Sequence, residues 1–183
     1  MASEKRIAWL DVESTGIDAS SCNLLEVACI VTDMELNILD EEGYRAVIKY
    51  SPEEVVEMQA KTDPYVLDMH SNTGLWDELP NGKPKETVDE ELLAYIQRFA
   101  PEYRQAFLGG NSITLDRNFI IPNLKKVGEH LHYQSIDVTT IAILAEAWYG
   151  LSFEKSYLHA ALSDIKESVN QLKYFKSLLP ASK

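Results

Sequence analysis

Runs of apolar and β-branched residues fill most of the N-terminal part of the chain, with short polar segments between them. Residues 7–10 are largely apolar and lead into a polar stretch that ends in a Ser-Thr-Gly turn, while residues 24–32 form a longer apolar run. A further run covers residues 38–50, after a polar gap short enough for an antiparallel hairpin. This pattern predicts three strands in succession.

Helical signals follow these strands. Residues 51–54 place Ser at an N-cap, Pro at the first helical position and acids in the first turn. Asp63-Pro64 opens a second helix, and residues 87–90 match a capping box before an apolar stripe that ends near Pro101. The last predicted helix presents one apolar face. Its members are Ile165, Val169, Leu172 and Phe175.

Two further short strands alternate with helices in the second half of the chain. Residues 106–111 have the pattern of a buried strand that breaks at its glycines, and residues 135–138 form a fifth strand. A helix is expected over residues 112–120, and another over residues 139–148, capped by one of its two threonines. A strand meander followed by alternating helices and strands predicts an α/β fold with a mixed five-stranded sheet flanked by helices.

Composition is that of a globular protein. The chain has 183 residues, of which 45% are apolar and 25% charged, so a single domain over residues 1–183 is expected. It contains no apolar run of transmembrane length and no visible signal peptide, which predicts no membrane partner and a cytoplasmic location. Cys22 and Cys29 lack a C-x-x-C spacing, so a reducing compartment and no zinc are expected.

The net charge of −12 limits the class of nucleic-acid substrate. Proteins that bind long nucleic acid gain most of their affinity from Lys and Arg on phosphates. A polynucleotide substrate of this chain should therefore be short, or be held by metal ions and a few local contacts.

Asp11 and Glu13 are the first candidate site residues. They are two apart at the end of an apolar strand, so both carboxylates point to the same face of the sheet. Like charges in a desolvated position need a cation, and Mg²⁺ or Mn²⁺ prefers carboxylate oxygens. By themselves the two acids are better explained by a solvated strand edge.

His159 and Asp164 form a second candidate pair near the C-terminus. A spacing of five places the two side chains on different sides of a regular helix, so His159 is expected at or before the helix start and Asp164 one turn in. Taken alone, either residue is explained by a polar helix face.

Three motifs taken together are far more specific than any one of them alone. D-x-E at residues 11–13, G-N-S-I-x-x-D at residues 110–116 and H-x-x-x-x-D at residues 159–164 closely resemble the DEDDh group of 3′ to 5′ exonucleases and, within it, the oligoribonuclease family. The resemblance extends from Trp9 to about Phe175 and implies a ribonuclease H-like fold in one DEDDh exonuclease domain.

The resemblance also implies a set of catalytic roles. Four carboxylates would gather two divalent ions, Mg²⁺ or Mn²⁺, and His159 would take a proton from the attacking water. The carboxylates in the matching positions are Asp11, Glu13, Asp116 and Asp164. An inactive relative would be expected to lack one of these residues or His159, and all five are present.

Positions that hold substrate follow from the same resemblance. Ile17 is implied as a wedge between two bases, with Tyr65 and His70 at the scissile end. A further group is implied to cap the 5′ side of the substrate, partly from the partner subunit of a homodimer. It comprises Ser112, Tyr133, Gln134 and Thr139. The family pattern is altered in this sequence at several places, namely Ser14, Ile17, Tyr65, Gln134 and Ala160.

The function that the resemblance implies is exonucleolytic hydrolysis of very short single-stranded RNA, down to dinucleotides. A DEDDh exonuclease for longer RNA or DNA is the alternative, which the acidic composition disfavours. A phosphatase of the haloacid dehalogenase type would need a second Asp and a downstream Lys, and the D-x-E-S-T-G segment fits that class poorly.

Overall fold

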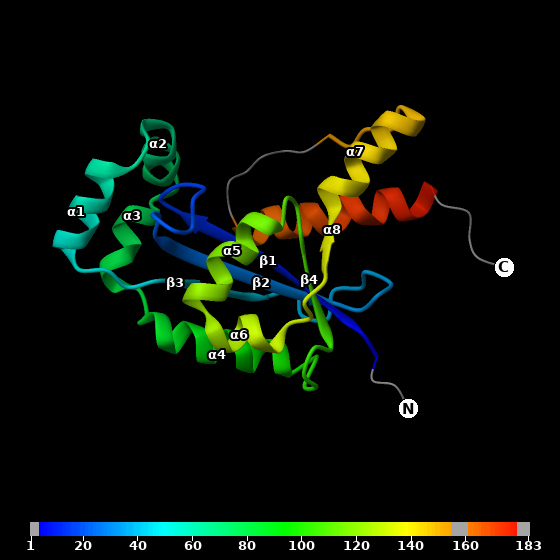
Figure 1. Ribbon diagram of the computed structural model, residues 1–183, viewed down its shortest axis with the longest axis horizontal. Helices are drawn as coiled ribbons and strands as arrows, with labels where there is room; N and C mark the ends of the chain where they lie inside the picture. The colour runs from blue at the N-terminus through cyan, green and yellow to red at the C-terminus, as the bar shows by residue number, and fades with distance from the viewer. Residues whose placement is uncertain (1–3, 155–160, 179–183) are drawn as a thin grey trace.

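The computed structural model describes residues 4–154 and 161–178. Its centre is a five-stranded sheet with the strand order β3-β2-β1-β4-β5 (Figure 1). The strands are β1 Arg6–Ser14, β2 Leu24–Thr32, β3 Tyr44–Val47, β4 Ala106–Gly110 and β5 Ser135–Asp137. β1 pairs antiparallel with β2 and parallel with β4, so the mixed sheet and the opening meander are confirmed.

Helices surround this sheet and supply its cover (Figure 1). They are α1 Pro52–Lys61, α2 Pro64–Thr73, α3 Leu75–Glu78, the 3₁₀ turn η1 Leu79–Asn81, α4 Lys85–Gln97, α5 Thr114–Asn123, α6 Lys125–His130, α7 Val138–Tyr149 and α8 Ala161–Leu178. Within the described residues, no helix combines the length and apolar character that crossing a membrane requires.

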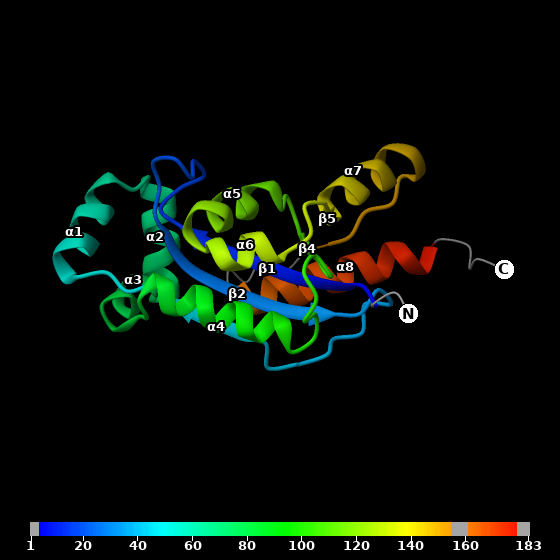
Figure 2. The same cartoon turned by 60° about the horizontal axis from the view of Figure 1, so that its bottom comes forward.

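The two faces of the sheet have separate cores because strand side chains alternate in direction. Ala8 and Leu10 of β1 belong to a cluster formed with α4, α5 and α6. Ile7 and Trp9 belong to a second cluster that includes Ile165 of α8. Figure 2 shows α4 and α6 on the near side of β1 and β2, with α8 behind them. The sheet is therefore the middle layer of three.

The helices α1 to α3 lie together at one end of the sheet (Figure 1). Val55 and Met58 of α1 pack with Trp76 of α3 and with Leu25 and Val47 of the sheet. Ser51 is the N-cap of α1, as the sequence predicts, and it also forms the reciprocal bonds of a capping box with Glu54. This group of helices faces the end of β1 at which the strand bulges, between Glu13 and Ser14.

β4 has no side chain where it passes Trp9. Gly109 is the parallel partner of Trp9, and a Cβ atom added to Gly109 would lie 2.5 Å from Ile7 and 3.3 Å from the Trp9 ring. Real Cβ atoms essentially never come within 3.0 Å of another heavy atom in this way. The glycine lets the Trp9 indole lie across the neighbouring strand, where it is fully buried.

Three local predictions differ from the structure. The strand expected over residues 38–50 is limited to β3, because the polar segment before it turns through Gly43, whose φ is 69°. α4 begins two residues before Thr87, and the Asp89 carboxylate instead accepts bonds of 3.0 Å from the backbone N–H groups of Lys126 and Val127 at the start of α6.

The third difference concerns α7. Its N-cap is Asp137, whose carboxylate accepts a 2.9 Å bond from the Thr139 N–H, so the helix begins before either threonine. This arrangement leaves the Thr139 hydroxyl available for a different contact, described below.

Candidate active site

The carboxylates of Asp11 and Glu13 lie on the face of the sheet that α8 covers. They share the register of Ile7 and Trp9, which pack against α8. Asp164 lies in the first turn of α8, and its charge acts on both acids. Residues far apart in the sequence are thus brought to one place.

Asp116 approaches the same strand from the opposite layer. It lies in the first turn of α5 and is only 8% exposed. Its Oδ1 accepts a 3.0 Å bond from the backbone N–H of Val12, the residue between the two β1 acids. Burial raises the pKa of Asp116 to about 7, although the Val12 bond acts in the opposite direction. The structure therefore brings together all four predicted carboxylates.

The ionised forms of the β1 acids are disfavoured by burial and by mutual repulsion. Burial, then the charges of Glu26, Asp164 and Asp116, raise the pKa of Glu13 to about 8. The pKa of Asp11 is raised well above its usual value, by burial first and by Asp116 second. A bound cation would reverse this balance, because it favours every ionised carboxylate near it.

The donor set fits a hard divalent cation, since all of its side-chain atoms are carboxylate oxygens. In the described ranges, no three His, Cys, Asp or Glu side chains gather closely enough to hold a single ion. Mg²⁺ is usually held by only one or two carboxylates, while water and phosphate oxygens complete its shell. Pairs drawn from these four acids match that requirement.

Glu26, which the sequence does not single out, is a buried acid beside Glu13 that forms an ion pair with Arg45. Glu26 is the register partner of Glu13 on β2 and is 4% exposed. Arg45 of β3 binds both Glu26 oxygens, at 2.6 and 3.0 Å, and also binds both oxygens of Glu78. The guanidinium compensates the buried charge of Glu26. The hairpin register was the signal that could have revealed this pair.

His70 lies next to Glu13 and is almost completely buried, at 1% exposure. Its Nε2 is 2.9 Å from the Ser14 carbonyl oxygen, and its Nδ1 is 3.9 Å from the Glu13 carboxylate. The Trp76 ring meets the imidazole edge-on at 5.7 Å. Burial lowers the pKa of His70. The imidazole is therefore placed to orient the end of β1.

A cavity of about 170 Å³ opens between β1, β4 and α8. Asp11 and Asp164 line it together with polar groups of Asn111 and Ser168. Asn111 directly follows β4, and its amide nitrogen donates a 2.6 Å bond to the Ser168 hydroxyl. The acids thus share a small polar space with a hydrogen-bonded side-chain pair.

The other predicted site residues fall into two groups. Ile17 and Tyr65 are 80% and 69% exposed, on the loop after β1 and on α2. Ser112 lies beside Thr139, whose hydroxyl oxygen accepts a 2.9 Å bond from the Ser112 N–H. Ile17 follows Glu13 by four residues and Ser112 precedes Asp116 by four, so both positions lie near the acids along the chain.

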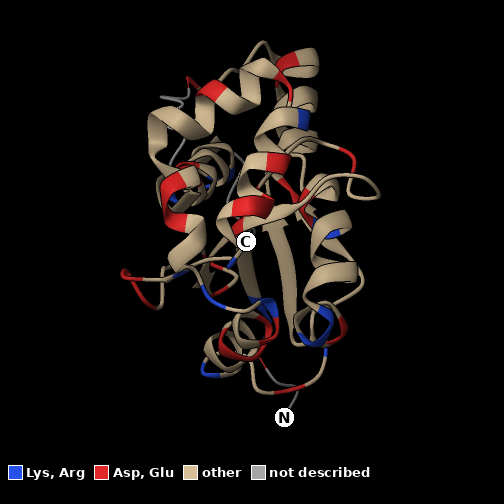
Figure 3. Cartoon of the chain, turned by 90° about the vertical axis from the view of Figure 1, so that its left-hand side faces the viewer, with Lys and Arg blue, Asp and Glu red and all other residues tan. Residues whose placement is uncertain are grey.

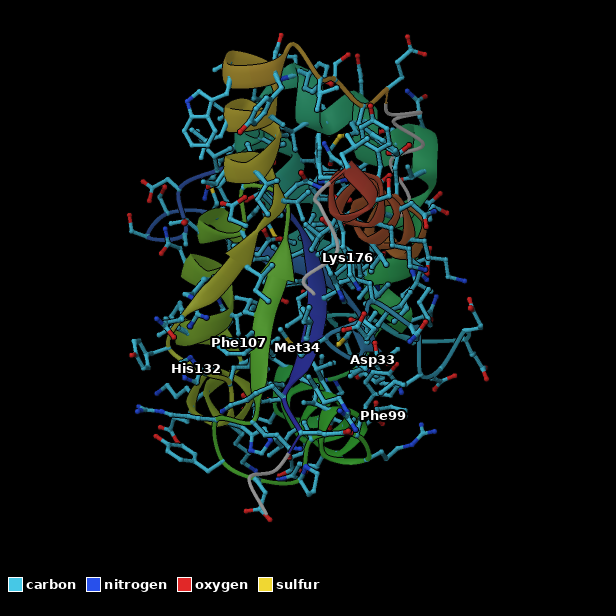
Figure 4. All side chains as sticks on the ribbon, turned by 90° about the vertical axis from the view of Figure 1, so that its right-hand side faces the viewer. Asp33, Met34, Phe99, Phe107, His132 and Lys176 are labelled. Carbon is cyan, nitrogen blue, oxygen red and sulfur yellow. The ribbon has the colours of Figure 1, made fainter. Side chains whose placement is uncertain are left out.

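Tyr133 and Gln134 are at the other end of the sheet, before β5. The Tyr133 ring is 67% exposed and stacks on His132, with ring centroids 4.6 Å apart. His132 in turn lies 4.6 Å from Phe107 of β4, and Figure 4 shows these two side chains together on one edge of the sheet. His159, the predicted base, lies outside the described residues.

Comparison with known proteins gives the family. A family model described as Exonuclease matches residues 8–172. The chain is 38% identical to an oligoribonuclease of Francisella tularensis, over 98% of each protein. The chain belongs to the oligoribonuclease family. It is also 38% identical to an oligoribonuclease of Leifsonia xyli, over 95% of this chain and 84% of that protein. Members of this exonuclease family are metal-dependent 3′ to 5′ exoribonucleases, and this chain is an enzyme of that class.

Solved structures show the same fold in longer proteins. Exonuclease I of Methylocaldum szegediense superposes with a TM-score of 0.71 at 15% identity, over 97% of this chain and 41% of that one. Exonuclease I of E. coli in complex with a dA16 oligonucleotide gives a TM-score of 0.68 at 13% identity, over 95% and 41%. The chain therefore covers less than half of the length of each exonuclease I. The shared fold confirms the predicted ribonuclease H-like architecture.

Proposed function

We propose that the chain degrades very short single-stranded RNA, down to dinucleotides, from the 3′ end to nucleoside 5′-monophosphates. The observation that carries this proposal is the convergence of Asp11, Glu13, Asp116 and Asp164 around β1. Family membership supports the reaction, and the name of the curated relatives supports the short substrate.

In this proposal the four carboxylates hold two divalent ions, Mg²⁺ or Mn²⁺. Bound there, such ions supply orientation for the attacking water and neutralise charge on the phosphate and the leaving oxygen. The exposed side chains of Ile17 and Tyr65 hold the bases, and His159 takes the proton of the attacking water. Buried His70 keeps Glu13 and Ser14 in place beneath the substrate.

The charge distribution supports a short substrate. Figure 3 shows Asp and Glu positions spread from one end of the chain to the other, while Lys and Arg positions are more frequent towards the end that carries the N-terminus. A net charge of −12 leaves few cations to displace counterions along an extended strand. Contacts at the acid site and its immediate surroundings should therefore provide most of the affinity.

End-labelled RNA of two to about twenty nucleotides tests the substrate. We expect faster turnover per 3′ end on the shortest RNA, full dependence on Mg²⁺ or Mn²⁺, and a shallow dependence of the rate on salt, because few phosphate contacts are made. Faster cleavage of the long RNA, or of DNA, would instead identify an exonuclease for longer 3′ ends. Undiminished turnover in excess EDTA would contradict the metal requirement.

We also propose that the protein acts as a homodimer. α7 contains a single charged residue, Glu146, yet only Val138 of this helix is buried, and Ile143 and Trp148 are 60% and 66% exposed. An apolar groove of about 640 Å³ runs between α7 and α8. A helix that is apolar on all sides usually lies in an interior. A second copy that covers α7 provides that interior, and Tyr133 then completes the partner's site.

Mixing two inactive variants tests the composite site. Asp11→Ala and Tyr133→Ala are each expected to turn over dinucleotides poorly. A two-fold interface repeats the same patch on both chains, so subunit exchange should create one site with both residues intact and restore part of the activity. Sedimentation should show a dimer for both variants. Proven exchange without recovery would mean that Tyr133 acts within its own chain or has no role.

A cytoplasmic location completes the proposal. Cys22 and the buried Cys29 are both free thiols, which is usual in a reducing compartment.

A further inference from the structure

We propose that Asn111 and Ser168 are positioning residues that hold Asp164 ready for divalent cations before any cation binds. This inference rests on the proposed two-metal function. The two side chains do not belong to the set that contacts metal or RNA. They act by fixing α8 to the end of β4 at the edge of the acid site.

The bond between them is short and lies in a protected position. The Asn111 amide nitrogen donates to the Ser168 hydroxyl at 2.6 Å, and Ser168 is 7% exposed. The Ser168 hydroxyl donates in turn to the Asp164 carbonyl oxygen at 2.9 Å. Ser168 lies one helical turn after Asp164, so the bond is made directly behind the acid.

The same amide extends the contact in the other direction. Its Oδ1 accepts a 3.2 Å bond from the Thr139 hydroxyl, whose oxygen accepts from the Ser112 N–H at 2.9 Å. Every donor in this series points towards α8, an arrangement in which hydrogen bonds polarise and strengthen one another. Asn111 therefore joins the loop after β4 to both α7 and α8.

Strained backbone at Ser112 shows that this junction is held firmly. Ser112 has a φ of 50°, in the left-handed region that non-glycine residues rarely adopt. The Asp137 carboxylate and the Thr139 hydroxyl both accept from its N–H group, at 3.1 and 2.9 Å. Such conformations persist where surrounding contacts determine them, and they concentrate at functional sites.

A tether is needed because the acids repel one another. When Asp11 and Glu13 ionise to receive a cation, their charges repel that of Asp164, and the repulsion pushes the first turn of α8 away from β1. Apolar contacts of Ile165 and Val169 hold the helix to the sheet but have little directional preference. The amide-to-hydroxyl bond adds a fixed direction.

Manganese binding without RNA is the direct test. We expect Ser168→Ala and Asn111→Ala each to raise the Kd for Mn²⁺, measured from the electron paramagnetic resonance signal of the free ion, by about five- to tenfold, the effect of losing one hydrogen bond. Ser177→Ala is the matched control, since within residues 4–154 and 161–178 its hydroxyl bonds to the Tyr174 carbonyl oxygen of the same helix alone, and it should keep the wild-type Kd.

The double variant sharpens this test. Both substitutions remove the same bond. The double variant, Ser168→Ala with Asn111→Ala, should therefore have the same Kd for Mn²⁺ as the single variants, so that the two effects are not additive. Additive effects, or single variants within twofold of the Ser177→Ala control, would overturn the tether. If Ser168→Ala fails to fold, the half-exposed Asn111→Ala decides by the same comparison.

Kinetics then separates the two ends of the Asn111 amide. At saturating Mn²⁺, Ser168→Ala should recover the wild-type kcat and KM, whereas Asn111→Ala should keep a raised KM for dinucleotides, because Thr139 and Ser112 are released. A wild-type protein that binds no Mn²⁺ would refute the proposed function itself. Wild-type binding with unaffected variants would refute the tether alone.

Discussion

Glu13→Gln should lower kcat on dinucleotides by at least about 10³-fold while the protein stays folded. The amide keeps the shape of the side chain but is a poor ligand for a hard cation. Loss of a metal ligand removes several kcal/mol of transition-state stabilisation, and each ~1.4 kcal/mol corresponds to a factor of ten. Release of mononucleotides, separated by chromatography, gives kcat. Glu42→Gln, an exposed acid in the loop before β3, is the control and should retain full activity.

Although Glu13→Gln should lower activity, it should stabilise the metal-free protein against unfolding. The pKa of Glu13 in the folded state is about 8, whereas the unfolded chain ionises this group near its usual 4.5. Between those values the folded state binds more protons, so the free energy of unfolding falls as pH rises from about 4.5 to about 8. In EDTA at pH 8, Glu13→Gln should therefore melt at a higher temperature than wild type. Added Mg²⁺ should raise the melting temperature of wild type more than that of the variant. A variant that melts lower in EDTA at pH 8 would contradict the repulsion.

His159→Ala should lower kcat by about 10² to 10⁴, the usual contribution of a positioned general base. The rate of the wild-type enzyme should rise with pH through the titration of this imidazole, and that limb of the profile should be absent from the variant. The Kd for Mn²⁺ should stay unchanged, because His159 is not proposed as a ligand. Wild-type rates, or loss of metal binding, would show that a different group accepts the proton.

The fold was largely predictable because its signals are local. The apolar runs of β1, β2 and β3 predict the opening meander, and the short polar gap after β2 predicts its hairpin with β3. The apolar face of α8 predicts where that helix packs. The position of Asp11 and Glu13 on one face followed from strand alternation alone. Their grouping with Asp116 and Asp164 required the family resemblance, since neither spacing nor composition relates α5 and α8 to β1.

Long-range contacts explain what the sequence could not predict. Asp89 lies inside the capping box predicted at residues 87–90, yet its carboxylate accepts bonds from the backbone N–H groups of Lys126 and Val127 of α6. From the sequence alone, Arg45 has the pattern of an ordinary cation on an edge strand. The pairing of β2 with β3 brings it into hydrogen-bond distance of Glu26. In both cases the partner lies on another element, so the deciding energy term is absent from the local sequence.

The two glycines of β4 beside Trp9 limit which positions can be substituted when variants with new substrate preferences are sought. Any side chain at Gly109 would have to displace Ile7 or the buried indole, and one at Gly110 would lie 2.6 Å from Ile113. Variant libraries aimed at new substrate preferences should keep both glycines and randomise exposed positions such as Ile17 and Tyr65. Evolutionary freedom in this chain is thus concentrated in the surroundings of the site, while the strand beneath it is fixed by lack of space.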